Sequence, residues 1–509
     1  MKRNIALMIP LLAASVQAGN IRKPNIIFVL VDDMGYGDVS ALNEQCPFGT
    51  PHLDGMVRNG ISFTDAHSCS AVSTPSRYGI LTGRYNWRSN LKSQVYWGDE
   101  TCLIPEGRST MASMLKEKGY STACIGKWHL GWDWPGIEKG KDSIDFEKPI
   151  GRGPTAVGFD YFYGICGSLD MAPYVYVENE RPTAIPDHYT EGTGLGFWRK
   201  GLTAPDFVHE QVLPNFTQRA VNYIHQHAAD RNPFFLYLPL PSPHTPILPT
   251  KDWEGRSGVG AYGDFVMMTD AMMGQVLQAL ADCGIEENTL VVFTSDNGCS
   301  PAADFKTLKE KGHNPSYIFR GMKSDLYEGG HRIPCLLQWK GHTKPGKVEQ
   351  TICLTDFFAT FADLNGIKLK DNEGEDSYSL KTLLRRPDSK KIVREATVHH
   401  SYDGDFSIRQ GNWKLVVTPT SGGWSYPMAE DVKKGGFPLL QLYDIKNDIG
   451  EKQNVVAKHK SVALQLLKLL QVYVTAGRST PGTKQANDGE GRWKELEKVF
   501  KDYPELADE

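Results

Sequence analysis

The stretch that decides the fold is Asn25-Ile-Ile-Phe-Val-Leu-Val-Asp-Asp33, a continuous apolar run that stops at two adjacent carboxylates. A run that is apolar throughout, instead of alternating, is typical of a strand buried on both faces of a mostly parallel sheet. Helical patterns over residues 111–118 and 265–283 separate further runs of this kind. We therefore expect an α/β/α sandwich around a large mixed, mostly parallel sheet. Three other segments share the design and also stop at polar residues: Ser121–Ile125 ahead of Gly126-Lys-Trp-His129, Phe234–Leu238 ahead of a turn with His244, and Leu290–Phe293 ahead of Ser295-Asp-Asn-Gly298.

The polar residues behind these strands predict a metal site. Parallel strands end at one edge of a sheet, where proteins of this class bind their ligands. Asp32, Asp33, Asp296 and Asn297 offer hard oxygen atoms, which suit calcium or magnesium better than zinc. Adjacent buried carboxylates are costly unless a cation binds them. Each residue taken singly could also be a helix N-cap or a turn residue, but two such clusters at strand ends favour a metal.

A second feature is Ser73-Thr-Pro-Ser-Arg77, which is typical of the start of a helix. On a helix, Arg77 lies one turn beyond Ser73 and on the same face. A nucleophile at a positively polarised helix end, beside an arginine, is suited to attack on an anion. We assume that the strand ends at this point, because Lys127 and His129 can both face the site only if it does. The groups expected at the same edge are Lys127, His129, His244 and Lys323.

The composition is that of an ordinary globular protein. The 509 residues include 40% hydrophobic and 23% charged side chains, with a formal net charge of −4. This balance excludes disorder, collagen and coiled coil, and no basic run is long enough to suggest a nucleic-acid groove. Nine cysteines without a C-x-x-C pair exclude a disulfide scaffold and do not support a zinc ribbon. One or two disulfides remain open.

The N-terminus has the pattern of a secretory signal peptide. A basic start, Met1-Lys-Arg-Asn4, precedes a short apolar stretch, Ile5–Val16, and small residues lead to Ala18. The apolar stretch is shorter than a membrane anchor needs, so we expect residues 1–18 to be removed after Ala18. No later segment is long and apolar enough to cross a membrane.

After about residue 385 the pattern changes. Residues 396–400 and 406–417 look like short strands separated by the turn Tyr402-Asp-Gly404. Apolar residues between Val462 and Tyr473 recur at helical spacing, and Gly477 can end that helix. We expect a smaller C-terminal subdomain of antiparallel sheet and helix over residues 386–509. A catalytic domain over residues 19–385 precedes it.

Several of these segments together resemble one family. Ser73-Thr-Pro-Ser-Arg-Tyr-Gly-Ile-Leu-Thr-Gly-Arg84 is similar to the signature of type I sulfatases, and Gly119-Tyr-Ser-Thr-Ala-Cys-Ile-Gly-Lys-Trp-His-Leu-Gly131 to their second signature. The resemblance covers nearly all of the chain after residue 18, in order. It implies the fold of the alkaline phosphatase superfamily and a likeness to bacterial periplasmic carbohydrate sulfatases. The remaining matches are Pro24–Asp33, Thr294–Gly298, Arg320–Pro334 and Leu442–Asp448.

The resemblance implies that residue 73 is chemically modified. Sulfatases oxidise the serine or cysteine that opens the signature to formylglycine, and Ser73 stands at that position. Cys69 is not the match, because Ala71 stands where the signature has proline. One hydroxyl of the formylglycine hydrate attacks sulfur and expels the alcohol. The second hydroxyl of the hydrate then drives cleavage of the C–O bond, which releases sulfate and restores the aldehyde. A plain serine has no second hydroxyl and would be left as a stable sulfate ester.

The other roles that the resemblance implies follow from charge. One calcium ion would be held by residue 73 and the four oxygen donors of the predicted metal site. General acid help matters for an alkyl alcohol, which leaves poorly as an anion. Arg77, Lys127 and Lys323 would neutralise the sulfate, His129 would be the base that triggers its elimination, and His244 would be the acid that protonates the leaving oxygen.

The serine form of the signature implies an anaerobic-type sulfatase-maturing enzyme as partner, acting before export. Together with the signal peptide this indicates a periplasmic enzyme. Substrate contacts are expected from loops, and residues 168–174 and 399–403 are candidates. Asp170 and His400 would bind sugar hydroxyls, although each could equally be a buried structural residue.

The expected substrate is a carbohydrate sulfate, such as a sulfate of galactose or N-acetylgalactosamine in a glycan. Two alternatives stay open. The first is a phosphoester or phosphonate hydrolase of the same superfamily. The second is a non-catalytic protein that binds sulfated glycans and whose Ser73 stays unmodified.

Overall fold

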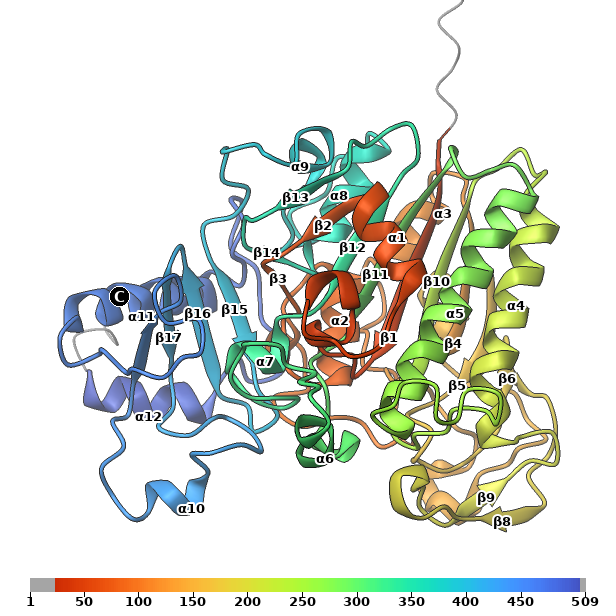
Figure 1. Cartoon of the computed structure of the whole chain (residues 1–509), viewed down its shortest axis with the longest axis horizontal. Helices are drawn as coiled ribbons and strands as arrows, with labels where there is room; N and C mark the ends of the chain where they lie inside the picture. Colours follow the sequence, from red (N-terminus) through yellow and green to blue (C-terminus); the bar gives the residue numbers. More distant parts are fainter. Residues whose placement is uncertain (1–22, 504–509) are drawn as a thin grey trace, which may run out of the picture.

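The computed structural model describes residues 23–503, so the expected signal peptide, residues 1–18, lies outside the described residues. A ten-stranded sheet forms the centre of the larger part of the molecule (Figure 1). A four-stranded antiparallel sheet lies beside it, in the C-terminal part of the chain. The predicted fold class, a large mixed sheet with helices plus a small antiparallel sheet with a helix, is confirmed.

The large sheet has a parallel centre and antiparallel flanks. The central strands β11, β1, β10, β4 and β5 are all parallel to their neighbours in this group. β12 runs antiparallel to β11, and β6 runs antiparallel to β5. In spatial order the strands are β13 (Gly346–Val348), β2 (Ile61–Phe63), β12 (Cys335–Gln338), β11 (Thr289–Ser295), β1 (Asn25–Asp32), β10 (Phe234–Pro243), β4 (Ser121–Lys127), β5 (Tyr161–Ile165), β6 (Val177–Glu178) and β7 (Arg181–Pro182).

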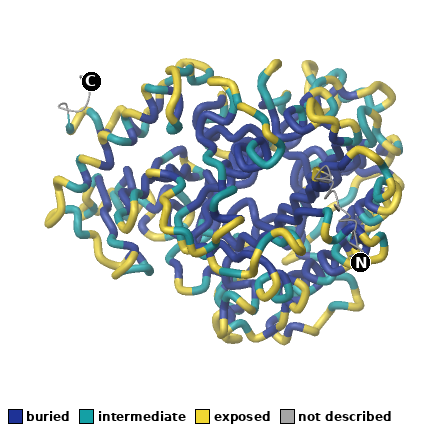
Figure 2. The backbone as a smooth tube through the Cα atoms, turned by 90° about the horizontal axis from the view of Figure 1, so that it is seen from above, coloured by how far each residue is buried: buried dark blue, intermediate teal, exposed yellow. Residues whose placement is uncertain are grey.

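Strand β1 is central, as its apolar sequence predicts. All of its residues are buried, and Ile27 pairs with Leu236 of β10 on one side and Val291 of β11 on the other. Both faces of this strand are covered by apolar side chains, which explains why the hydrophobic run is unbroken. The buried backbone is concentrated in the middle of the larger part, with exposed segments around it (Figure 2).

Helices cover both faces of the large sheet. Phe234 packs against Tyr223 of α4, while the next residue, Phe235, packs against Phe361 of α8. Successive side chains of a strand point to opposite faces, so α4 and α8 lie on opposite sides. The helices of the first group are α1 (Pro51–Asn59), α4 (Val212–His227) and α5 (Ala261–Asp282), and those of the second are α2 (Ser73–Thr82), α3 (Met111–Lys116) and α8 (Asp356–Leu364).

Two helix boundaries differ from the sequence-based expectation. The helix expected over residues 265–283 begins earlier, directly after Gly260, whose φ of 111° is outside the helical range. The helix expected over 111–118 ends at Lys116, and Gly119 follows with a φ of 85°. Glycine tolerates this positive φ without strain and so marks both chain reversals. The other short elements of the larger part are β3 (Ala66–His67), α6 (Phe305–Glu310), α7 (Glu328–His331), β14 (Ile352–Cys353), α9 (Lys381–Arg385), β8 (His188–Thr190) and β9 (Gly201–Thr203).

The C-terminal part has its own hydrophobic core, built on the small sheet and α11. The stretch 406–417, expected to be extended throughout, is a hairpin, because Gly411 takes a φ of 56° and turns the chain. Gly477 ends α11 with a φ of 67°, as predicted. The domain boundary near residue 385 stays a prediction. The elements are β15 (Thr397–His400), β16 (Phe406–Gln410), β17 (Trp413–Val416), β18 (Gln441–Asp444), α10 (Ala429–Val432), α11 (Lys460–Ala476) and α12 (Lys494–Asp502).

Neither disulfides nor a membrane-spanning helix are found in the described part of the chain. All nine cysteines lie within it, and each is free. No helix between residues 23 and 503 combines the length and the hydrophobicity that crossing a bilayer requires.

We predict that a buried ion pair, Arg88 with Asp376, is needed for stability. The guanidinium contacts both carboxylate oxygens, at 2.7 and 3.0 Å, and both side chains are fully buried. Asp376→Asn would leave Arg88 buried without its counter-charge and should lower the free energy of unfolding by about 3–5 kcal/mol. Thermal unfolding at neutral pH measures this, with exposed Asp142→Asn as the control. An unchanged midpoint in Asp376→Asn would contradict it.

The loss of stability caused by Asp376→Asn should depend on pH. Burial alone would raise the pKa of Asp376, but Arg88 outweighs burial and holds that pKa below its ordinary value. A lowered carboxyl pKa stabilises the fold above the unfolded pKa of about 4 and loses this contribution as the pH falls through the folded pKa. The difference between wild type and Asp376→Asn should therefore shrink below about pH 4.

Candidate active site

The residues expected at one edge of the sheet meet there. Asp32 ends β1, and Lys127 ends β4. Asp296 follows β11, and His244 follows β10. These strands are parallel, so their carboxyl ends and the side chains behind them converge on one edge.

Ser73 is the first residue of α2, as predicted, and every residue of this helix is buried. Its Oγ donates to Asp32 Oδ1 at 3.1 Å and lies 3.4 Å from Asn297 Oδ1. The helix N-terminus adds a positive partial charge at this point. Gly79 lets α2 sit this deep, because a Cβ there would come within 2.3 Å of Cys69 Sγ. The structure thus holds the candidate nucleophile among oxygen ligands at the start of a buried helix.

Three buried ion pairs surround Ser73, each joining an expected cation to an expected carboxylate. The pairs are formed by Lys127 Nζ and Asp32 Oδ2 at 2.5 Å, by Lys323 Nζ and Asp33 Oδ1 at 2.7 Å, and by Arg77 Nη2 and Asp296 Oδ2 at 2.9 Å. A second Arg77 nitrogen donates to the backbone oxygen of Lys127 at 2.9 Å. His244 Nε2 lies 3.7 Å from Asp33 Oδ2. Each charge is therefore held in position by a partner of opposite sign.

The carboxylates are close enough to repel one another, which is a feature of cation sites. Burial and the charge of Asp32 raise the pKa of Asp296 to about 6, even with Arg77 beside it. Burial would also raise the pKa of Asp32, but Lys127, His244 and Arg77 outweigh it and hold that pKa well below the usual value. Ligand atoms of Asp32, Asp33 and His244 lie within 4.8 Å of one another. The carboxylate oxygens of Asp32, Asp33 and Asp296 fit a hard divalent cation.

His129 is arranged as a proton acceptor. It follows the end of β4 with a φ of 57°, and this turn of the backbone lets both Lys127 and His129 reach the site. Its Nε2 is 2.8 Å from the backbone oxygen of Tyr96, so Nε2 carries the proton. Nδ1 is buried and has no hydrogen-bond partner among residues 23–503. Burial, with the charges of Lys127 and Arg77, holds the pKa of His129 well below its ordinary value, so the ring is neutral.

A cavity of about 220 Å³ opens at this group. Asp170, one of the two expected sugar ligands, belongs to its lining; Asp170 Oδ2 accepts from Arg199 Nη1 at 2.6 Å. His400 does not line the cavity: its Nδ1 contacts the Asn86 side-chain amide, and its Nε2 the backbone oxygen of Gly404. The lining contains Ser73, His129, His244 and Lys323, and also Trp97, Ser168, Arg199, Tyr402 and Trp424.

Several residues that line the cavity could not be predicted from the sequence. Arg199 and Trp97 come from loops without a catalytic pattern, and only the fold brings them next to Ser73. Ser168 and Tyr402 lie in the two loop segments that were expected to contact substrate. Trp424 lies in the C-terminal part, on the loop that follows β17.

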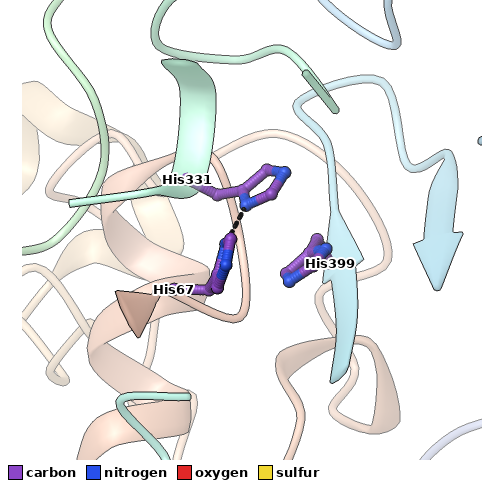
Figure 3. A group of neighbouring side chains, drawn as sticks. All are labelled: His67, His331 and His399. Carbon is purple, nitrogen blue, oxygen red and sulfur yellow. Dashed lines mark hydrogen bonds between the residues drawn. The ribbon is translucent and has the colours of Figure 1, made fainter. Parts of the chain in front are cut away.

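A second cluster of ionisable side chains lies at the junction of the two parts. Figure 3 shows His67 hydrogen-bonded to His331, with His399 beside them. The rings of His331 and His399 are stacked at 3.9 Å and nearly parallel, so their in-plane lone pairs cannot converge on one ion. His331 Nε2 already contacts Lys414 Nζ at 3.2 Å and the backbone oxygen of Leu326 at 2.9 Å. This cluster is a structural contact between α7, β3 and the small sheet.

Comparison with known proteins defines the class. A family model described as Sulfatase matches residues 24–367. The chain therefore belongs to the sulfatase family, whose members are sulfuric ester hydrolases.

The relatives include enzymes named for sugar sulfates. The chain is 32% identical to an N-acetylgalactosamine-6-O-sulfatase of Bacteroides thetaiotaomicron, over 89% of this chain and 93% of that protein. It is 31% identical to arylsulfatase A of Homo sapiens, over 91% and 90%. A solved sulfatase structure from work on glycosaminoglycan metabolism by Bacteroides thetaiotaomicron matches with a TM-score of 0.77 and 32% identity, over 88% of this chain and 99% of that chain.

We predict that calcium stabilises the folded protein through this site. Protein treated with a chelator should gain about 2.7 kcal/mol when calcium is added at a hundredfold its dissociation constant, because the ion binds the folded state alone. Asp296→Asn should lose most of that gain, while exposed Glu310→Gln should keep it. Thermal unfolding with and without calcium measures both. A wild-type protein that does not respond to calcium would contradict the prediction.

Proposed function

We propose that this sulfatase hydrolyses a sulfate ester of a carbohydrate, with a galactose or N-acetylgalactosamine sulfate as the substrate. The observation that carries the proposal is the environment of Ser73 Oγ, which contacts Asp32 Oδ1 at 3.1 Å beside a cavity that His129, His244 and Lys323 also line. The name of the similar Bacteroides protein, an N-acetylgalactosamine-6-O-sulfatase, supports the sugar.

Residue 73 acts in this proposal as formylglycine, made from serine by an anaerobic-type sulfatase-maturing enzyme before export to the periplasm. Formylglycine supplies a hydrated aldehyde as nucleophile. The metal ligands are Asp32, Asp33, Asp296 and Asn297, together with residue 73. These residues would hold calcium, which when bound would supply positive charge near the reacting groups.

Arg77, Lys127 and Lys323 stabilise the charge of the reacting sulfate. Arg77 and Lys127 are fully buried, and Lys323 borders the cavity with its side chain about one-tenth exposed. Ion pairs with the three carboxylates hold these cations before substrate arrives, so little reorganisation is needed during the reaction. The cations balance the carboxylates, and a bound divalent ion makes the site attractive to an anion.

The two histidines divide the proton transfers. His129 has a neutral ring and an Nδ1 that no residue between 23 and 503 contacts by a hydrogen bond, which suits a base that takes the proton from a hydroxyl of residue 73 during sulfate release. His244 lines the cavity and is the acid that protonates the leaving oxygen of the sugar. General acid–base catalysis of this kind contributes about 10²–10⁴-fold to rate.

We predict that Ser73→Ala abolishes turnover and leaves the fold intact, because the substitution removes the nucleophile and only two side-chain contacts. Mass spectrometry of the peptide that contains residue 73, after expression with a maturing enzyme, should detect formylglycine in wild type. Turnover of a panel of monosulfated saccharides is then measured.

Wild-type rates in Ser73→Ala would contradict the mechanism. Phosphatase activity above sulfatase activity would favour a phosphoester hydrolase, and unmodified serine with undiminished glycan binding a binding protein.

We also predict that His244→Ala loses more activity on a sugar sulfate than on an aryl sulfate. A sugar alkoxide needs a proton to leave, whereas a phenolate leaves without one. The loss on the sugar sulfate should be about 10²–10⁴-fold. Exposed His342→Ala is the matched control and should keep both activities. Equal losses on the two substrates would remove His244 from the acid role.

A further inference from the structure

Two partly exposed tryptophans border the candidate catalytic cavity. The chain has eleven tryptophans, all within the described residues. Only Trp97 and Trp424 are exposed, with 39% and 40% of their surface accessible. Both line the cavity that contains Ser73. Each indole keeps about two-fifths of its surface accessible at this cavity, which leaves apolar area for a ligand to cover.

Trp97 is held rigidly relative to the proposed base. Its backbone N–H and that of Gly98 donate to the Glu100 carboxylate at 2.7 and 3.0 Å. The residue before it, Tyr96, accepts from His129 Nε2 at 2.8 Å through its backbone oxygen. The Arg199 guanidinium lies over the Trp97 ring at 4.9 Å. The loop is therefore tied to the catalytic group, and Arg199 limits the freedom of the indole.

Trp424 is held in the same way, but from the C-terminal part of the chain. Its backbone N–H donates to Ser324 Oγ and Asp325 Oδ1, both at 2.9 Å. Gly423 permits this contact, because a Cβ there would come within 2.4 Å of Ser324 Oγ. Ser324 follows Lys323, which is paired with Asp33 in the catalytic group. The backbone of Trp424 is thus fixed relative to Lys323, and its ring contacts Tyr402 at 5.2 Å between centroids.

We propose that Trp97 and Trp424 form a stacking platform for a pyranose ring of the substrate, so that the C-terminal part supplies half of the sugar-binding surface. This inference rests on the proposed function and specifies how the same site holds its substrate. An indole is flat and apolar and suits the C–H face of a pyranose. A galacto-configured ring has C–H groups at positions 3, 4 and 5 on one side, which makes that face broad.

Polar groups for the sugar hydroxyls lie in the same cavity. Asp170 Oδ1 and Ser168 Oγ are buried and have no partner in the described part of the chain. Buried polar atoms are nearly always hydrogen-bonded, so these two are free to bind hydroxyl groups of a ligand. Asp170 is kept in place by Arg199, which donates to Oδ2 at 2.6 Å. The cavity therefore combines an apolar platform with hydrogen-bonding groups, which is the usual composition of a site for a sugar.

The test uses binding as well as turnover. Trp97→Ala and Trp424→Ala, each in the Ser73→Ala background, are titrated with N-acetylgalactosamine 6-sulfate by calorimetry. Each should bind about tenfold more weakly than the Ser73→Ala protein, and Trp424→Phe should recover most of the affinity. Trp339→Ala, on the strand end remote from the cavity, is the matched control and should bind normally. Thermal unfolding confirms that each variant is folded.

In matured enzyme, the same two substitutions should raise KM for the sugar sulfate about tenfold with a smaller change in kcat, while inhibition by inorganic sulfate stays constant. Unchanged binding and unchanged KM in both variants would overturn the inference. Wild type that hydrolyses no monosulfated saccharide would overturn the proposed function instead. The binding titration would then still decide whether the tryptophans hold a sugar.

Discussion

Three carboxylates and three cations are buried together at the edge of the sheet, and the rest of the site depends on their balance. Removing charges from water costs several kcal/mol per ion, so none of the pairs would be stable alone. Asp32, Asp33 and Asp296 each find a partner within 3 Å. Burial first, and then the charge of Asp32, raises the pKa of Asp296, even with Arg77 beside it. An arrangement of this kind tolerates an added divalent cation and an anionic substrate better than a neutral pocket would.

The same kind of balance joins the two parts of the molecule. Glu328 and Glu451 both contact Lys414 of β17, at 3.0 and 2.8 Å. Asp65 contacts Arg409 of β16 at 2.8 Å, next to the cluster of His67, His331 and His399. The pair of Glu328 attaches the small sheet to α7, and the pair of Asp65 attaches it to the segment that leads into α2, whereas Glu451 belongs to the C-terminal part itself. Removing one partner would leave an uncompensated charge, so the attachment is specific.

This attachment has a consequence for the site. The small sheet contributes a loop whose Trp424 is bonded to Ser324, beside Lys323. A C-terminal part that only completed the fold would not need an exposed aromatic residue at the catalytic cavity. The geometry instead connects the anchoring of the small sheet to the surface that we propose for the sugar.

Much of the site could be predicted from the sequence because its residues stand directly behind strands. Asp32 and Asp296 end apolar runs, and the parallel topology brings such ends together. The segment that begins at Ser73 indicated the candidate nucleophile through its resemblance to the sulfatase signature. His400 could not be judged, because a histidine at the end of a strand carries no sign of whether it faces a cavity. The fold turns it toward Asn86 and Gly404 instead.

The sequence by itself determined which apolar runs are buried, which polar residues follow them, where the helix at Ser73 begins and which charges must be compensated. These are local properties, set by hydrophobicity, backbone preference and the cost of burying charge. Only the tertiary structure decided that Arg199, Trp97 and Trp424 share one cavity, and that His129 has a free Nδ1. These contacts join segments that are up to hundreds of residues apart in the sequence. Their geometry depends on how the loops pack, and no local sequence pattern predicts that packing.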